Sequence, residues 1–179
     1  MLLIKEYNRM NAVEYARRWA LDRNPLFTDF TGQGGNCTNF VSQSVYAGSC
    51  TMNYTPDVGW YYVSSLDRSP SWTGVEFFYD FMVNNMEIGP FMREVSRSEV
   101  EIGDVIQLAN ESGDFYHTLI ITGFRGRDIL VSAQSDDSLD RPLSSYNYAT
   151  LRFLHVDGVR VEIPENACFE GLINGTSLG

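Results

Sequence analysis

The chain has 179 residues, of which 44% are hydrophobic, so it is long enough for one domain with a core of its own. Its formal net charge of −10 disfavours nucleic acid as a partner, because the phosphates would be repelled. No stretch approaches the roughly 18 apolar residues of a membrane span, and the first residues lack the pattern of a signal peptide. These features are expected of a cytoplasmic protein or of a domain of an exported cell-envelope protein.

Amphipathic periodicity predicts helices in the first half of the chain. The expected helices run over 11–22, 37–48 and 75–84, and capping boxes mark the starts of the first and third. A glycine-rich loop over 27–35 leads into the second helix. The segment 49–72 is rich in turns and aromatic residues, so we expect it to be irregular and to lie along the surface.

From Gly103 onward the pattern changes to short runs rich in β-branched residues, which is typical of strands. The expected strands cover 104–108, 116–123, 128–134, 149–155 and 159–163. Helices followed by strands predict an α+β domain with a mainly antiparallel sheet. The whole chain, 1–179, then forms one domain, with a core over about 7–163 and a tail over 164–179 whose last residues are expected to fray.

Cys37 stands at the start of the second expected helix, directly after Gly34 and Gly35. A thiol attacks carbonyl carbons as the thiolate, and the unpaired N–H groups and dipole at a helix start favour that anion. The glycine pair permits a tight turn and the close approach of a substrate backbone. A buried structural cysteine is the alternative, but the polar neighbours Asn36 and Thr38 favour a nucleophile.

His117 precedes an apolar strand, so we expect it at a sheet edge, where it can serve as general base and acid or play a mere surface role. If the following hairpin turns at Arg125-Gly126, antiparallel pairing places Gln134 opposite His117, with Cβ atoms about 5 Å apart. Gln134 could then accept a hydrogen bond from the imidazole and fix its tautomer. A one-residue slip would break this pairing and make Asp136 the next candidate for the third catalytic residue.

A tetrahedral intermediate needs donors aimed at its oxyanion. The backbone N–H of Cys37 is the first expected donor, and the side-chain amide of Gln33 is the second, with Asn36 as the alternative.

The remaining cysteines, Cys50 and Cys168, are expected to be buried free thiols, with a bridge between them as the alternative. His155 lies between apolar residues and is expected to pack within a strand. Neither the cysteines nor the histidines have the spacing of a standard metal motif, so we expect no metal and no cofactor.

The run GGNCTNFVSQSVYAG resembles the core motif of the bacterial putative amidase domain family, a branch of the papain-like group related to CHAP and other cell-wall amidases. Further similar segments occur in order, namely YNRMNAVEYARRWALDRNP, SWTGVEFFYDF, IGDVIQL, YHTLIITG, SDDSLDRPLS and LRFLHV. The resemblance covers roughly residues 7–156 and implies a papain-like α+β fold, with N-terminal helices packed on the sheet that carries the histidine.

The same resemblance implies hydrolysis of an amide bond by a Cys–His pair with a third polar residue on the next strand. On matching positions these are Cys37, His117 and the slot at Gln134. The chain departs from the family pattern at two positions, because the family commonly has histidine where Gln134 stands and often aspartate where Asn36 stands.

The leading hypothesis is therefore a thiol-dependent hydrolase of a peptide or isopeptide bond, with peptidoglycan stem peptide as a candidate substrate. One alternative is a catalytically weak module that holds wall peptides or glycans through the aromatic segment from Trp60 to Trp72. The other is an acyltransferase with the same Cys–His pair, in which an amine replaces water.

Overall fold

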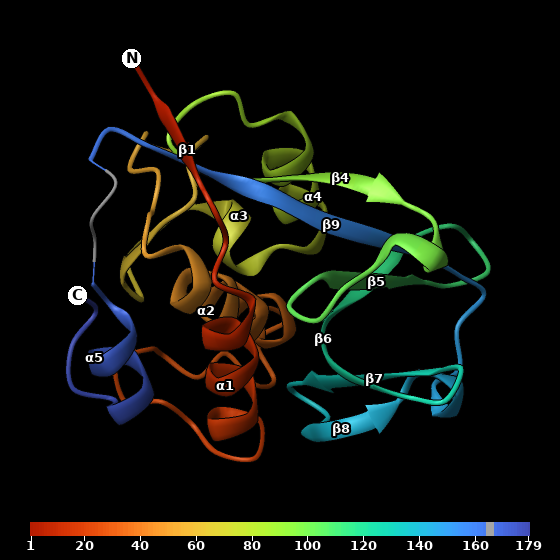
Figure 1. The fold of residues 1–179 in the computed structure, drawn as a ribbon. Helices are drawn as coiled ribbons and strands as arrows, with labels where there is room; N and C mark the ends of the chain where they lie inside the picture. Colours follow the sequence, from red (N-terminus) through yellow and green to blue (C-terminus); the bar gives the residue numbers. More distant parts are fainter. Residues whose placement is uncertain (164–166) are drawn as a thin grey trace.

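The computed structural model of the chain describes residues 1–163 and 167–179. Within this part the fold combines helices with a curled antiparallel sheet, so the predicted α+β class is confirmed (Figure 1). The expected boundary between core and tail at 164 lies outside the described residues. The helices are α1 (Arg9–Trp19), α2 (Asn36–Ser49), α3 (Pro70–Thr73), α4 (Val75–Asn84) and α5 (Phe169–Asn174), with short 3₁₀ turns η1 (Arg97–Glu99) and η2 (Leu143–Ser145).

In the described part of the chain, one seven-stranded sheet follows the order β1-β9-β5-β6-β7-β8, and β4 also pairs with β9. All its pairings are antiparallel. Its strands are β1 (Leu3–Lys5), β4 (Gly89–Val95), β5 (Val105–Ala109), β6 (Phe115–Arg125), β7 (Asp128–Ala133), β8 (Ser138–Pro142) and β9 (Thr150–Val161). A separate small hairpin joins β2 (Tyr62–Ser64) to β3 (Asp67–Arg68).

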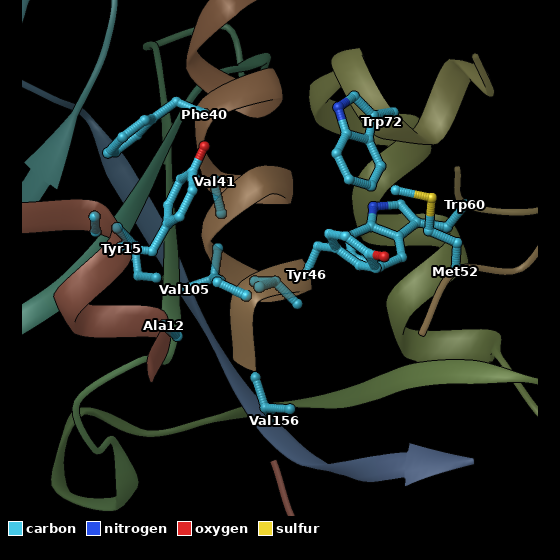
Figure 2. Close-up of a cluster of buried hydrophobic side chains, with 14 of the residues drawn as sticks. Ala12, Tyr15, Phe40, Val41, Tyr46, Met52, Trp60, Trp72, Val105 and Val156 are labelled. Atoms are coloured by element: carbon cyan, nitrogen blue, oxygen red, sulfur yellow. The ribbon is translucent and has the colours of Figure 1, made fainter. Parts of the chain in front are cut away.

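Strand β6 separates two hydrophobic clusters. Ile120 belongs to the cluster that the helices cover, whereas Leu119 and Ile121 belong to the cluster on the opposite face. This division follows from the two-residue period of a strand, in which successive side chains point to opposite faces. Helix α2 packs in the middle of the first cluster, so its side chains are buried almost all the way round (Figure 2).

Trp60 and Trp72 lie inside this first cluster with no exposed surface, and their ring centroids are 4.7 Å apart (Figure 2). The segment 49–72 is largely irregular, as predicted. Its tryptophans, however, are buried in the core and do not lie on the surface. This burial is explained by their apolar area, since an aromatic ring buried in a core contributes more than any weak surface contact. A binding module that uses the segment from Trp60 to Trp72 would therefore have to do so without the rings of these two tryptophans.

The hairpin between β6 and β7 differs from the prediction. It is closed by Arg125 and Asp128, so the two loop residues are Gly126 and Arg127. Gly126 has a φ of +60°, a conformation that favours glycine, and this explains why the turn is centred one residue later than expected. A register shift follows at Ile121/Gly123, and the described ladder ends with Ile120 opposite Ser132. His117 and Gln134 are consequently not a directly opposed pair.

Three other expectations change at the ends of elements. The N-cap of α1 is Asn8, whose side chain accepts from the N–H of Asn11, so the helix begins three residues earlier than the capping box suggested. The two strands expected over 149–155 and 159–163 form one continuous strand, β9. The last residues do not fray but form α5 and a final turn, held by a hydrogen bond from Tyr46 to the carbonyl of Leu178 at 2.6 Å.

Cys50 and Cys168 form a disulfide, so the expectation of two free thiols is wrong. The bridge joins the C-terminal end of α2 to the residue before α5, which are 118 positions apart. Their Cα atoms lie 5.5 Å apart because α5 packs beside α1 and α2, a proximity that spacing along the chain does not reveal (Figure 1).

Candidate active site

Cys37 is the second residue of α2 and is the free cysteine of the described chain. Gly34 has a φ of +82°, and Gly35 is the N-cap, with no side chain to cap the helix. A Cβ atom added to Gly35 would lie 3.2 Å from Cβ of Thr73, so the two glycines allow the tight entry into α2. The first N–H groups of the helix are left without a side-chain cap, which is the arrangement that binds anions and oxyanions.

A buried network of amide side chains fixes the start of α2. The Nδ2 atom of Asn36 donates to Oε1 of Gln134 at 2.8 Å, and Oδ1 of Asn36 accepts from the N–H of Phe30 and from Asn39. Gln134 in turn donates through Nε2 to the carbonyls of Trp19 and Asp22, at 2.8 and 2.9 Å. Gln134 is 3% exposed, and both hydrogens of its amide are used in these bonds.

This network changes the expected role of Gln134. Its hydrogen bonds in the described structure hold Asn36, the neighbour of Cys37, and the loop after α1. They do not go to His117. Whether Gln134 takes part in the chemistry stays a prediction, but its contacts are those of a residue that positions the cysteine.

His117 lies near the start of β6, opposite Leu108 of β5. The centroid of its ring lies 6.4 Å from that of Tyr116 and 6.1 Å from that of Tyr146. Burial lowers the pKa of His117 to about 4, while the negative charge of Asp136 acts in the opposite direction and the positive charge of Arg141 adds to the lowering. The imidazole is therefore neutral at pH 7, the form in which it can accept a proton.

The structure brings the backbones of Cys37 and His117 together, since the residues that follow them are joined by a hydrogen bond. Oγ1 of Thr38 lies 2.8 Å from Oγ1 of Thr118. Thr118 thus faces α2, and the alternation of the strand directs His117 toward the other face, beside Tyr146. Among the described residues, no hydrogen bond or ion pair links the Cys37 sulfur to the His117 ring. The Cys37–His117 pair therefore stays a prediction.

Asp136 is the charged residue whose field favours protonated His117. It is exposed and forms an ion pair with Arg141 at 3.2 Å, and Arg141 stacks on the ring of Tyr146 at 3.7 Å. The observed register is the one in which Asp136, rather than Gln134, becomes the candidate partner of the histidine.

Gln33 lies in the exposed turn before α2, where its backbone N–H donates to the carbonyl of Phe30 at 2.8 Å. Its role as an oxyanion donor stays a prediction.

His155 has polar neighbours that its apolar sequence context did not reveal. Its Nδ1 lies 2.7 Å from Oδ2 of Asp104, a fully buried carboxylate that also accepts from Arg9 at 2.7 Å. A cavity of about 680 Å³ opens beside this group and is lined by Glu101 and Asp157. None of the expected catalytic residues lines this cavity. The candidate active site is therefore the region of Cys37 and His117, whose side chains can carry out the expected chemistry. No group of His, Cys, Asp and Glu in residues 1–163 and 167–179 is arranged to hold a metal ion.

Sequence reasoning missed the residues that link the two backbones. Thr38 and Thr118 each directly follow a candidate catalytic residue, and a threonine next to the expected histidine in a largely apolar strand was the available signal. The Asn36–Gln134 hydrogen bond had a signal too, since both positions depart from the family pattern.

The chain belongs to the family described as "Putative amidase domain", which it matches over residues 6–156. Among curated proteins it is similar to "Uncharacterized protein YhbB" of Bacillus subtilis (strain 168), with 36% identity over 137 residues. That alignment covers 74% of this chain and 43% of the relative, so the chain spans less than half of that protein. No solved structure matches the chain significantly. None of the helices in the described part of the chain has the length and apolar character needed to cross a bilayer.

Proposed function

We propose that this domain is a thiol-dependent amidase that uses Cys37 as its nucleophile. The sulfur attacks the carbonyl carbon of an amide, the C–N bond breaks, and the amine leaves with a proton. Water then hydrolyses the thioester, which releases the carboxylic acid and restores the thiol. No cofactor is required for either step.

The observation that carries this proposal is the state of the three cysteines. Two are joined in a disulfide, whereas Cys37 is free and half-buried at an uncapped helix start. Disulfides persist in oxidising compartments, where a free thiol next to bound substrate is well placed for chemistry and a spare one is a liability. The bridge also supports placing the domain in an exported protein.

His117 supplies the general base and acid in this scheme. Its neutral ring can take the thiol proton and return it to the leaving amine. Since the ring and the sulfur are not hydrogen-bonded in the described structure, the scheme requires the imidazole to come within reach when substrate binds. Asp136 is the group that would then stabilise the imidazolium, and Gln134 would position Cys37 through Asn36.

The candidate substrate is an amide of a peptidoglycan stem peptide, a class suggested by the family resemblance. The donors proposed for the tetrahedral intermediate are the backbone N–H of Cys37 and the side-chain amide of Gln33.

The test incubates the purified domain with insoluble peptidoglycan and measures the free amino groups that appear. We expect release by the wild-type protein and none above background by Cys37→Ala or His117→Ala. Equal release by wild type and Cys37→Ala would overturn the thiol mechanism. Alkylation with iodoacetamide, read by intact mass, provides a substrate-independent check, because Cys37 is the single thiol outside the disulfide.

A further inference from the structure

A row of polar side chains crosses the sheet next to the start of α2, on the face that the helices cover. Thr118 of β6 lies opposite Gln107 of β5, which lies opposite Arg152 of β9. Thr118 and Gln107 have no exposed surface, and the side chain of Arg152 is 10% exposed. Thr38 extends the row to the cysteine: its Oγ1 lies 2.8 Å from Oγ1 of Thr118 and 3.8 Å from the sulfur of Cys37.

The arginine end of the row fixes the direction of the hydrogen bonds. A guanidinium can only donate, and Nε and Nη2 of Arg152 lie 2.8 and 2.6 Å from Oε1 of Gln107. This settles which end of the Gln107 amide is oxygen. Its Nε2 therefore donates, to the carbonyl of Val75 at 2.9 Å and to Oγ1 of Thr118 at 3.3 Å.

The same reasoning gives the direction of the hydrogen bond between the two hydroxyls. Thr118 accepts from Gln107, and the other described partner of its hydroxyl is Thr38. If Thr38 donated to Thr118, the hydrogen of Thr118 would be buried without an acceptor, which costs about 1–3 kcal/mol. Thr118 therefore donates to Thr38, and the hydrogen of Thr38 is left for the sulfur of Cys37.

We propose that this aligned chain, from Arg152 through Gln107, Thr118 and Thr38, presents a hydrogen-bond donor to the Cys37 sulfur and stabilises its thiolate. The proposal rests on the proposed role of Cys37 as nucleophile. Thr38 contacts the reacting sulfur and is a catalytic residue in this sense, whereas the other three position its hydrogen. No proton is transferred along the chain: the donor favours the negative sulfur before attack and again when the thioester is hydrolysed.

The arrangement suits a site in which the imidazole does not ionise the thiol in advance. His117 is neutral, so the donors to the sulfur before substrate binds are the N–H groups of the helix start and the hydroxyl of Thr38. Arg152 is well held as the origin of the chain, since its guanidinium stacks on the rings of Tyr79 and Phe115 at 3.5 and 3.7 Å. It also pairs with Glu76 at 3.0 Å.

The first test measures the rate of Cys37 alkylation by iodoacetamide between pH 5 and 10. For Thr38→Val we expect the pH of half-maximal rate to rise by about one unit and the rate at pH 7 to fall about tenfold. Thr38→Ser keeps the hydroxyl and should retain the wild-type profile. Thr122→Val is the matched control, because Thr122 is a buried threonine on the same face of β6 whose hydroxyl bonds Ser132 and Asp140 instead.

A second test reverses the direction of the hydrogen bonds by a substitution at Gln107, which does not itself contact the sulfur. In Gln107→Glu the new carboxylate still accepts from Arg152 but accepts from Thr118 as well, so Thr118 turns and Thr38 donates away from the sulfur. We expect an upward shift of the pH profile in the wild-type background and none in the Thr38→Val background. A shift of equal size in both backgrounds would mean that the new charge acts directly through space, and this would overturn the chain.

The Thr38 and Thr122 variants change no charged group, whereas Gln107→Glu adds one carboxylate. The charged and titratable groups on the elements around this end of α2 include His117 on β6, Asp136 after β7, Arg68 before α3, and Asp29 with its ion-pair partner Arg23. A wild-type profile for folded Thr38→Val overturns the proposal while leaving Cys37 as nucleophile. Loss of the proposed function is distinct, since it appears as unchanged turnover in Cys37→Ala. If Thr38→Val does not fold, Thr38→Ala takes its place in both tests, because it also removes the hydroxyl that faces the sulfur.

Discussion

The two ends of helix α2 each carry a cysteine, and the fold surrounds them in opposite ways. At the N-terminal end, Cys37 is free and half-buried, its sulfur lies 3.8 Å from the hydroxyl of Thr38, and the preceding residue, Asn36, is hydrogen-bonded to Gln134. At the C-terminal end, Cys50 has a left-handed backbone (φ of 49°) and is bridged to Cys168. The ring of Tyr46 in the last turn packs against Trp72 within the apolar core.

The Cys37 end of α2 therefore carries the reactive thiol, whereas the Cys50 end contributes to the stability of the fold. The contacts at the Cys37 end are single, directional hydrogen bonds, so each of them sets the position or the charge preference of one group. The contacts at the Cys50 end are covalent and apolar, and they tie the last segment of the chain to the core. Substitutions at the two ends should therefore affect different measurements.

The largest expected effect is the loss of turnover at the N-terminal end. Cys37→Ser should lower amide hydrolysis at least about 10³-fold, because a hydroxyl is a far weaker nucleophile near pH 7. Its urea midpoint should stay close to that of the wild type, since the sulfur is half-buried and makes one weak hydrogen bond. A strongly lowered urea midpoint together with retained turnover in Cys37→Ser would contradict this assignment of the two ends.

Removing the disulfide should do the opposite. The double variant Cys50→Ser/Cys168→Ser opens a link between residues 118 positions apart, so we expect a loss of about 3–5 kcal/mol in the free energy of unfolding. Equilibrium urea unfolding measures this loss, with Cys37→Ser as the control that removes a thiol but no bridge. The alkylation rate of Cys37 at pH 7 should be unchanged in the folded fraction, which would show that the two ends are uncoupled.

How far the sequence predicts these two ends depends on the range of the interactions. The helix start at Cys37 was predictable, because glycine residues and the apolar periodicity of α2 are local signals. The bridge was not, since it depends on where α5 packs, over a hundred residues away. The strand register beside His117 was predicted wrongly, because Gly126 shifts the turn and a bulge follows, and either change alters every pairing beyond it.

A comparison of two glutamines tests whether the amide network stabilises the N-terminal end. Gln134→Leu leaves Asn36 and the carbonyls of Trp19 and Asp22 without their buried partner, so we expect a loss of about 2–3 kcal/mol in stability. Gln33→Leu changes an exposed side chain and should leave stability within about 0.5 kcal/mol. It should lower turnover if Gln33 is an oxyanion donor. Urea unfolding and hydrolysis assays on both variants separate the two roles, and equal destabilisation would contradict the network.

The smallest expected effect concerns acid stability and depends on His117. Burial lowers the pKa of His117 to about 4 in the folded protein, against 6.5 when the ring is free, so the unfolded chain binds more protons between these values. The stabilisation is fully present above pH 6.5 and is lost as the pH falls toward 4. The ring is only partly buried, so we expect a loss on the order of 2 kcal/mol.

In His117→Asn this component of the pH dependence is absent, whereas the carboxylates of both proteins titrate alike. The difference between wild type and variant in urea unfolding free energy should therefore change between pH 7 and 4 and be constant above pH 7. A difference that stays flat over the whole range would mean that the ring is solvated and that folding does not lower the pKa of His117.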